Sequence, residues 1–293
     1  MAAIRFDSKF LKKLDHLMLR SRGVYSGDLM GGRRSRRRGV GLEFADHRSY
    51  SPGDDFRYLD WNVLGRLDEL FLKVFEMEED LYVYVLIDCS GSMDFGDPTK
   101  LDVAKMTAAA LSYIGLAKQD IVRVSFFSED LIDKSELFKG RDQIFRVFDF
   151  LNQERPSGKT SLTASLRNFV KYTRRHGIVI ILSDFLDPGS LEEGLKFLVH
   201  NRFGVYGLHV IDPREERPDL VGDLNLTDTE TGESLPLNLR RNTIDAYRQV
   251  FQEHCQHLKR FMNSYNGRYM QVPTHTSLED LFLRVFRREG LFT

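Results

Sequence analysis

Residues 81–87, Leu-Tyr-Val-Tyr-Val-Leu-Ile, end directly in a short polar loop, and this junction constrains the fold more than any other feature. The run is nearly continuous in aromatic, aliphatic and β-branched side chains, which is typical of a strand buried on both faces of a parallel sheet. Asp88 follows at once, with hydroxyl groups at Ser90 and Ser92. An Asp in that position lies at the carboxyl edge of the sheet, where open α/β sheets bind ligands.

Strand and helix patterns alternate downstream of this run. Strands are predicted at residues 81–87, 121–127, 178–182, 204–210 and 268–272. Helices are predicted at residues 100–116, 141–151, 162–174, 191–199, 243–264 and 278–288. This order predicts an α/β domain over residues 81–293, with a Rossmann-like, doubly wound and mostly parallel sheet. Residues 219–239 interrupt the alternation and predict a polar hairpin inserted on one edge.

Residues 1–80 differ from the rest of the chain in composition and in the pattern of apolar residues. They are predicted to be an N-terminal extension with helical and β structure. Apolar residues at helical spacing follow a possible cap at Asp7. Residues 31–41 are rich in Gly and Arg, with five arginines between Arg33 and Arg38. So many charges cannot pack in a core, so a solvated loop is expected there, with binding to an acidic partner or nucleic acid as the alternative.

Composition narrows the possible partners and compartments. The chain has 293 residues, with 42 Lys and Arg against 43 Asp and Glu, so its formal net charge is -1 and no global field favours nucleic acid. No stretch approaches the roughly 18 apolar residues of a transmembrane helix, and residues 1–10 lack a signal-peptide segment. Two cysteines, Cys89 and Cys255, cannot form a disulfide framework, so we expect a reducing, cytoplasmic environment.

Two later loops are predicted to reach the same sheet edge as Asp88. Asp184 follows the apolar run 178–182, and Thr160 lies in a Ser-Gly-Lys-Thr-Ser loop before the helix predicted at residue 162. The carboxyl ends of parallel strands meet at one edge, so these oxygens can converge. An oxygen-only set favours Mg²⁺ or Mn²⁺ over zinc. Ser161 or Thr163 could replace Thr160, and the alternative for the first loop is simple capping of the next helix.

This set resembles the metal-ion-dependent adhesion site (MIDAS) of von Willebrand factor A domains. In that family the serines of a D-x-S-x-S motif bind the metal directly, and a loop Thr and a second Asp complete the site. The matching residues are Asp88, Ser90, Ser92, Thr160 and Asp184. The resemblance implies that the ion keeps an open position for a carboxylate of a partner protein. Such a module would bind proteins without catalysing a reaction.

A second resemblance covers the segment ahead of this domain. Residues 48–61, Arg-Ser-Tyr-Ser-Pro-Gly-Asp-Asp-Phe-Arg-Tyr-Leu-Asp-Trp, are similar to the signature R-x-Y-x-P-G-D-D-x-R-x-x-D-W of the bacterial family Domain of Unknown Function fifty-eight. Its members carry this segment before an A-type domain and are typically encoded beside a MoxR-type AAA+ ATPase. The resemblance therefore implies an adaptor or co-chaperone that works with such an ATPase.

The signature itself has two interpretations. Its Pro-Gly pair predicts a turn, and its alternating charges could form Arg–carboxylate pairs that lock the turn against the A-type domain. Trp61, the sole tryptophan, would then be the apolar anchor of a structural clasp. A partner-binding surface is the alternative.

A metal-dependent enzyme is the competing class of function. A hydrolase or phosphotransfer enzyme could use Asp88 or Asp184 with the same divalent ion. Such an enzyme also needs a general base or a phosphate-binding group near the metal, and the sequence offers no candidate for either. A non-enzymatic, metal-dependent interaction module is therefore the favoured prediction.

Overall fold

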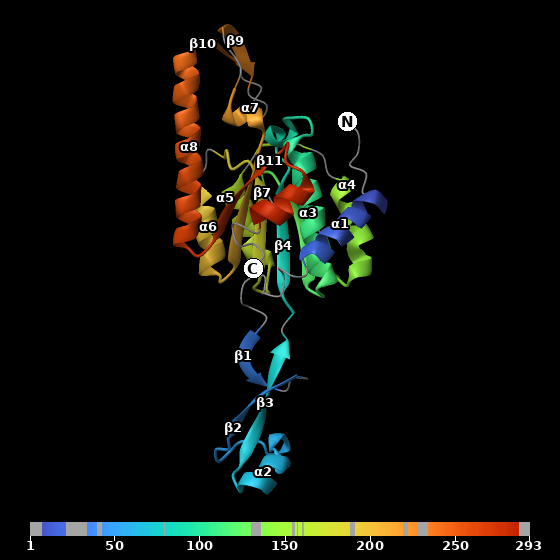
Figure 1. Ribbon diagram of the computed structural model, residues 1–293. Coiled ribbons are helices and arrows are strands. Elements are labelled where there is room, and N and C mark those ends of the chain that lie inside the picture. Colours follow the sequence, from blue (N-terminus) through green and yellow to red (C-terminus); the bar gives the residue numbers. More distant parts are fainter. Residues whose placement is uncertain are drawn as a thin grey trace.

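The computed structural model describes residues 8–21, 34–39, 43–78, 80–129, 136–153, 156, 158–159, 161–187, 191–218, 222–227 and 234–286. A six-stranded sheet with the order β11-β8-β7-β4-β5-β6 forms its centre (Figure 1). The strands are β4 (Tyr82–Asp88), β5 (Ile121–Phe127), β6 (Phe138–Lys139), β7 (Ile178–Ser183), β8 (Gly204–Ile211) and β11 (Arg268–Pro273). All neighbours are parallel except β6, which pairs antiparallel with β5. The predicted mostly parallel α/β sheet is confirmed.

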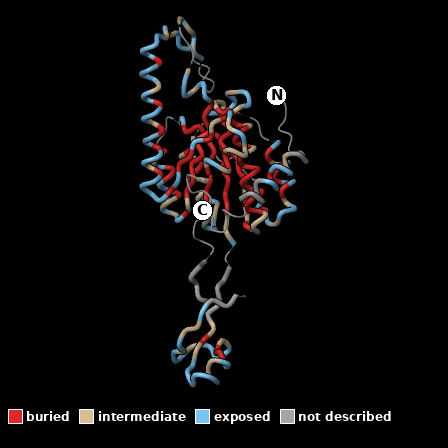
Figure 2. The backbone as a smooth tube through the Cα atoms, viewed as in Figure 1, coloured by how far each residue is buried: buried red, intermediate tan, exposed pale blue. Residues whose placement is uncertain are grey.

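The apolar strands are buried on both faces, as their composition predicts. Val83, Val85 and Ile87 of β4 join one apolar cluster, and Tyr84 and Leu86 join the other. Helices α3 (Lys100–Ala117) and α4 (Ile144–Gln153) cover the first face. Helices α5 (Leu162–Tyr172), α6 (Leu191–His200) and α8 (Arg241–Ser264) cover the second. Figure 2 shows this buried centre in red between the exposed outer surfaces of the helices.

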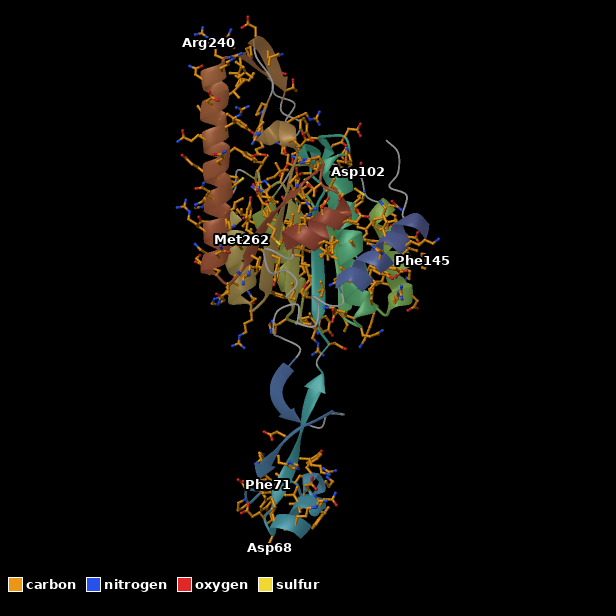
Figure 3. The ribbon with its side chains drawn as sticks, viewed as in Figure 1. Asp68, Phe71, Asp102, Phe145, Arg240 and Met262 are labelled. Atoms are coloured by element: carbon orange, nitrogen blue, oxygen red, sulfur yellow. The ribbon has the colours of Figure 1, made fainter. Side chains whose placement is uncertain are left out.

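Helix α8 contacts the sheet at a glycine of β8. A Cβ atom at Gly207 of β8 would lie 2.4 Å from the end of the Met262 side chain, so a larger residue there would displace that side chain. Figure 3 labels Met262 near the end of α8 that lies against the sheet. The region predicted as one helix at 278–288 is divided into α9 (Leu278–Asp280) and the π-helical turn η4 (Leu281–Phe286), as far as the chain is described.

The predicted hairpin forms, but as a separate small sheet. Strands β9 (Gly222–Thr227) and β10 (Ser234–Leu239) pair only with each other among the described residues. They follow the short helix α7 (Pro213–Glu216) and lead into α8. In Figure 1 this hairpin projects beyond the carboxyl ends of the central strands, beside the start of α8.

Helix α1 (Ser8–Ser21) packs on the α/β domain. Leu14 is buried in the cluster that α3 covers, and the rings of Phe10 and Phe148 meet with centroids 5.9 Å apart. The Tyr113 hydroxyl of α3 donates a hydrogen bond to Asp15. These contacts join the beginning of the chain to the larger domain, and the predicted domain division at residue 80 stays a prediction.

The remainder of the extension is a small sheet with its own helices. Strands β1 (Arg34–Gly39), β3 (Phe71–Glu78) and β2 (Glu43–Ser49) form an antiparallel sheet in the order β1-β3-β2. Figure 1 shows it projecting from the amino-terminal end of β4. The prediction of a loop for the arginine-rich stretch is wrong over β1. Pairing with β3 satisfies the backbone on one side, and a charged edge strand is a common protection against further strand pairing.

The charges of the signature pair with one another inside the small sheet and its turn, and not with the α/β domain against which the clasp interpretation locks them. Arg48 pairs with Asp54 at 2.5 Å, and Arg57 pairs with Asp55 at 2.6 Å. Asp60 accepts hydrogen bonds from the backbone at the start of α2 (Trp61–Leu67) and pairs with His47 at 2.8 Å. These contacts fold the turn between β2 and β3 onto itself.

Trp61 is not the apolar anchor that the clasp interpretation predicts. Its side chain is 67% exposed, and Phe56 nearby is 60% exposed. As the first residue of α2, Trp61 follows the capping Asp60, and its ring faces outward while Leu59 takes the buried position. The exposed Trp61 ring therefore removes the anchor from the clasp interpretation, and the partner-binding surface stays a prediction.

We expect Trp61→Ala to change the free energy of unfolding by less than about 0.5 kcal/mol, because the variant leaves no cavity. The matched variant Leu59→Ala removes a side chain that is 4% exposed and should cost about 2–5 kcal/mol. Urea denaturation followed by circular dichroism measures both. Equal losses in the two variants would restore the anchor role of Trp61.

None of the described helices is long and apolar enough to cross a membrane.

Candidate metal centre

Asp88 ends β4 with its carboxylate fully buried and fixed from two sides. The Ser90 backbone N–H donates to Oδ1 at 3.0 Å, and the Ser183 hydroxyl donates to Oδ2 at 2.6 Å. Ser183 comes from β7, the neighbouring strand in the sheet. The position of the Asp88 carboxylate is therefore set by its own loop and by the adjacent strand.

The two serines of the loop present their hydroxyl oxygens together. Ser90 Oγ and Ser92 Oγ lie 3.0 Å apart. Ser90 begins the turn η2 (Gly91–Asp94), but its side chain caps no backbone group there, and the next helix, α3, is capped by Thr99. The alternative in which Asp88 and Ser90 merely cap the next helix is therefore wrong. The hydroxyl groups face each other instead of the helix.

Asp184 reaches the same edge from the end of β7. Its side chain is 2% exposed, and its Oδ2 accepts a hydrogen bond of 2.8 Å from Lys100 Nζ. A hydrogen bond from Ser92 also reaches this carboxylate, which joins the two predicted loops. Phe185 follows in the left-handed conformation, with φ of 51°, and is buried. This backbone turn directs Asp184 toward the loop of β4 while the Phe185 ring enters the core.

Thr160, the predicted third hydroxyl ligand, lies outside the described residues. The residues on either side of it lie close to the centre. The Gly91 backbone N–H donates to Gly158 O at 3.0 Å, and Ser161 N–H donates to Ser128 O at 2.8 Å. Of the two alternatives, Thr163 lies against Gly194 of α6, which directs it away from the centre. Ser161 remains a candidate.

Lys100 is a residue of this cluster that sequence reasoning missed. It is the first residue of α3, yet its side chain is only 1% exposed. Besides Asp184, its ammonium group contacts the carboxylate of Glu215 in α7. A lysine at a helix start is normally solvated, so composition and spacing carry no signal for this role. Only the topology brings α3, α7 and the end of β7 together.

Burial and charge determine the pKa values in this cluster. Burial, reinforced by the neighbouring Asp184 carboxylate, raises the pKa of Asp88 to about 7. Burial also disfavours the ionised form of Asp184, but the charge and hydrogen bond of Lys100 outweigh it and lower the pKa of Asp184. For Lys100, burial is outweighed by its two carboxylate partners, so its pKa is raised. Burial raises the pKa of Glu215.

The donor set fits a small, hard divalent ion. Two adjacent ligands of an octahedral ion with bonds of about 2.1 Å lie about 3.0 Å apart, which is the separation of the two serine oxygens. Two carboxylates from neighbouring strands flank this pair, and all four side chains supply oxygen only. No cluster of three or more His, Cys, Asp or Glu side chains suited to a metal occurs in the described part of the chain. An ion here would depend on the hydroxyl oxygens.

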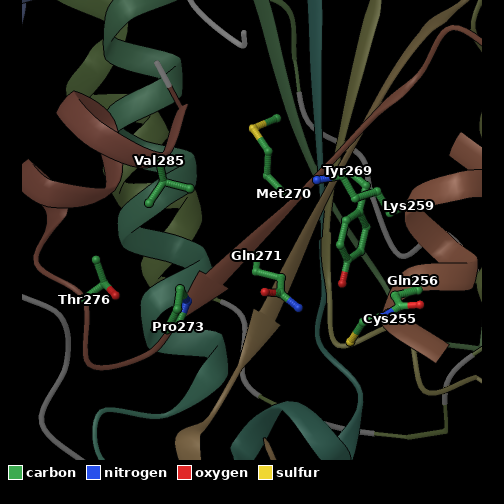
Figure 4. A pocket seen from close by; sticks show the side chains of 9 residues that line it. All are labelled: Cys255, Gln256, Lys259, Tyr269, Met270, Gln271, Pro273, Thr276 and Val285. Carbon is green, nitrogen blue, oxygen red and sulfur yellow. The ribbon is translucent and has the colours of Figure 1, made fainter. Parts of the chain in front are cut away.

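A separate pocket lies between helix α8 and β11, which is an edge strand of the central sheet. Its volume is about 290 Å³, and Figure 4 shows Cys255, Tyr269 and Gln271 turned toward one another in it. Burial raises the pKa of Cys255, so this thiol stays protonated at neutral pH and is a weak nucleophile. Tyr269 contacts His209, whose pKa burial lowers to about 3. The pocket therefore does not have the charge pattern of a catalytic thiol site.

The doubly wound sheet, with carboxylates and serines at the carboxyl ends of its central strands, defines an A-type domain. The family described as "protein of unknown function DUF58" matches residues 46–259, so the chain belongs to that family. An uncharacterized protein of Mycobacterium tuberculosis is 28% identical over 232 residues, which are 77% of this chain and 73% of that protein.

Two solved structures align with this chain at low sequence identity. An aerotolerance-related membrane protein from Bacteroides fragilis aligns with a TM-score of 0.47 at 15% identity, over 71% of this chain and 99% of that one. Proximal thread matrix protein 1 from the mussel byssus, solved with zinc in its MIDAS motif, aligns with a TM-score of 0.42 at 13% identity. That alignment covers 69% of this chain and 46% of the mussel chain.

Proposed function

We propose that this chain is a non-enzymatic protein-interaction module whose binding depends on a divalent metal ion. The observation that carries the proposal is the pair of serine oxygens, 3.0 Å apart, between the buried carboxylates Asp88 and Asp184. Mg²⁺ or Mn²⁺ is the ion that this oxygen set favours. Asp88, Ser90, Ser92 and Asp184 would hold it, with Thr160 or Ser161 as a further ligand.

The chain's own groups explain why a partner would be needed. Ser90 and Ser92 are neutral donors, and Lys100 already neutralises part of the charge of Asp184. An ion in this environment stays under-neutralised and can accept a carboxylate of a partner protein as an additional ligand. Asp88 is hydrogen bonded to Ser183 and the Ser90 backbone, so its orientation is set before binding. The site is therefore suited to docking an Asp or Glu side chain.

The proposed partner is a MoxR-type AAA+ ATPase in the cytoplasm, with this chain as its adaptor or co-chaperone. The family resemblance supports this partner, and the site chemistry supports the kind of contact. Capture of the purified ATPase by the immobilised chain should require Mg²⁺ and be reversed by a chelator. Capture that is equally strong in chelator would contradict metal-dependent docking.

A metal-dependent hydrolase or phosphotransfer enzyme that uses Asp88 or Asp184 is the alternative. Several contacts argue against it. Asp88 is fully buried and bonded through both oxygens, and Asp184 is paired with Lys100. The next carboxylate, Glu215, is also paired with Lys100. Neither aspartate is placed to attack a substrate. Turnover of phosphate esters or nucleic acid with Mg²⁺ or Mn²⁺ that Asp88→Asn abolishes would reverse this ranking.

We expect Ser92→Ala to weaken binding of Mn²⁺ about 10-fold or more while the fold stays intact. The variant removes one neutral oxygen donor and the hydrogen bond to Asp184, yet leaves the buried apolar clusters unchanged. Isothermal titration calorimetry gives the affinity, and circular dichroism checks the fold. Ser112→Ala, a buried serine of α3 outside the centre, is the matched control. Unchanged Mn²⁺ affinity in Ser92→Ala would remove Ser92 from the ligand set.

A further inference from the structure

Lys100 is one of the most deeply buried charged side chains in the described part of the chain. At 1% exposure its ammonium group has lost nearly all contact with water, which is costly unless charged partners replace the solvent. Asp184 Oδ2 lies 2.8 Å away, and Glu215 makes the second contact. The ammonium group therefore connects a carboxylate of the candidate metal centre to a carboxylate outside it.

Glu215 is held in place for this contact by its own helix. It belongs to a capping box at the start of α7, in which its Oε2 accepts a hydrogen bond of 3.0 Å from the Asp212 backbone N–H. The other oxygen, Oε1, faces Lys100. Because both oxygens are fixed, Glu215 can balance the charge of Lys100 without first becoming ordered. Glu215 is not itself among the candidate ligands.

The charges of the cluster do not cancel. The cluster holds three carboxyl groups, on Asp88, Asp184 and Glu215, and the Lys100 ammonium group, which contacts Asp184 and Glu215. Two further positive charges would balance the set when all three carboxyl groups are ionised. A divalent ion beside the serines would balance the set as a whole, but the ion itself would be neutralised only in part, because Asp184 and Glu215 also pair with Lys100. Lys100 repels the same ion and Glu215 attracts it, although neither residue needs to touch it.

We propose that Lys100 is the internal counter-charge of the metal centre, and that with Glu215 it sets the affinity for a divalent ion. By taking up part of the charge of Asp184, Lys100 weakens metal binding and leaves a bound ion with more positive charge for a partner carboxylate. Glu215 limits this effect by partly neutralising Lys100. Both are positioning residues, and the inference rests on the proposed function.

The test uses two substitutions that are expected to change the affinity for Mn²⁺ in opposite directions. Calorimetric titration of the chelator-stripped full chain with Mn²⁺ should show about 10-fold tighter binding for Lys100→Met, because a positive charge near the ion is removed. Glu215→Gln should bind Mn²⁺ several-fold more weakly, because Lys100 is then less neutralised. The double variant Lys100→Met/Glu215→Gln should lie closer to the wild type than Lys100→Met does, and it keeps the test open if Lys100→Met alone does not fold.

A second buried lysine of the same helix provides the control. Lys105 is 7% exposed, and its ammonium group lies over the Phe126 ring. Lys105→Met should leave Mn²⁺ affinity unchanged. A merely structural role for Lys100 and Glu215 predicts weaker binding in both of their variants, so a loss of affinity in Lys100→Met overturns the inference.

The same titrations separate this inference from the proposed function. If the wild type binds no Mn²⁺ but Lys100→Met does, Lys100 itself takes the place of the ion. The charge role is then upheld and the metal-dependent function of the natural chain is overturned. If the wild type binds Mn²⁺ and Lys100→Met binds it equally, only the inference about Lys100 fails. If neither binds, both fail.

Discussion

Replacing Asp88 by alanine is expected to abolish binding of Mg²⁺ and Mn²⁺, with a loss of affinity of about 100-fold or more. Asp88 supplies one of the two carboxylates beside the serine pair, and it also fixes the loop through the Ser90 backbone and the Ser183 hydroxyl. Loss of the charge and of this support should act together. Supporting residues alone contribute roughly 10–100-fold to metal affinity in other proteins.

The protein should still fold without Asp88. The change leaves the Ser183 hydroxyl without this acceptor, which costs about 1–3 kcal/mol, but it also removes a buried carboxylate whose ionised form burial disfavours. Asp88→Asn keeps the size, removes the charge and replaces one of the two acceptor oxygens by a donor, so it should lose metal binding as well. Asp149→Asn on the exposed side of α4 is the control. Calorimetry that finds wild-type affinity in Asp88→Asn would exclude Asp88 from the centre.

Replacing Phe185 by alanine is expected to have the largest effect on stability, about 3–5 kcal/mol. The ring is 1% exposed and packs against the His209 ring at a centroid distance of 5.6 Å, beside Gly207 of β8. Its removal leaves a cavity between the sheet and α8. Because Phe185 follows Asp184 directly, a relaxed loop should also displace that carboxylate and weaken Mn²⁺ binding.

The matched control for Phe185 is Phe145→Ala. Phe145 is 57% exposed on α4, and Figure 3 shows it on the outer side of the molecule. Its loss should change the free energy of unfolding by less than about 0.5 kcal/mol. Urea denaturation gives both values. A loss below about 1 kcal/mol for Phe185→Ala would mean that the loop after β7 is held by other contacts.

The sequence predicts the central sheet well because its strands are buried on both faces. Strands β4, β7 and β8 have almost continuous apolar runs, and their observed ends lie within one residue of the predicted ones. Strand β6 has only two residues, too few for any periodic pattern. Strand β1 is made mostly of arginine, so its strand conformation depends on pairing with β3 and not on the preferences of its own residues.

The residues of the candidate centre were likewise predictable only in part. The carboxyl ends of parallel strands meet at one edge of a sheet, and this rule predicts that Asp88 and Asp184 lie there with the two serines. The structure places all four residues together. Their binding of a metal stays a prediction. The Lys100–Glu215 pair had no signal in the sequence, because the two residues lie far apart in the chain and meet only through the tertiary fold. The same limit applies to Trp61, whose exposure depends on the direction in which α2 leaves its cap.

The central claim is that a divalent ion binds between the serines and the two buried carboxylates. The most direct test is anomalous diffraction at the manganese absorption edge from crystals of the chelator-stripped chain soaked in Mn²⁺. We predict one strong peak about 2.1 Å from both Ser90 Oγ and Ser92 Oγ, on the side of Asp88 and Asp184. A soaked crystal without a peak at this position would contradict the account.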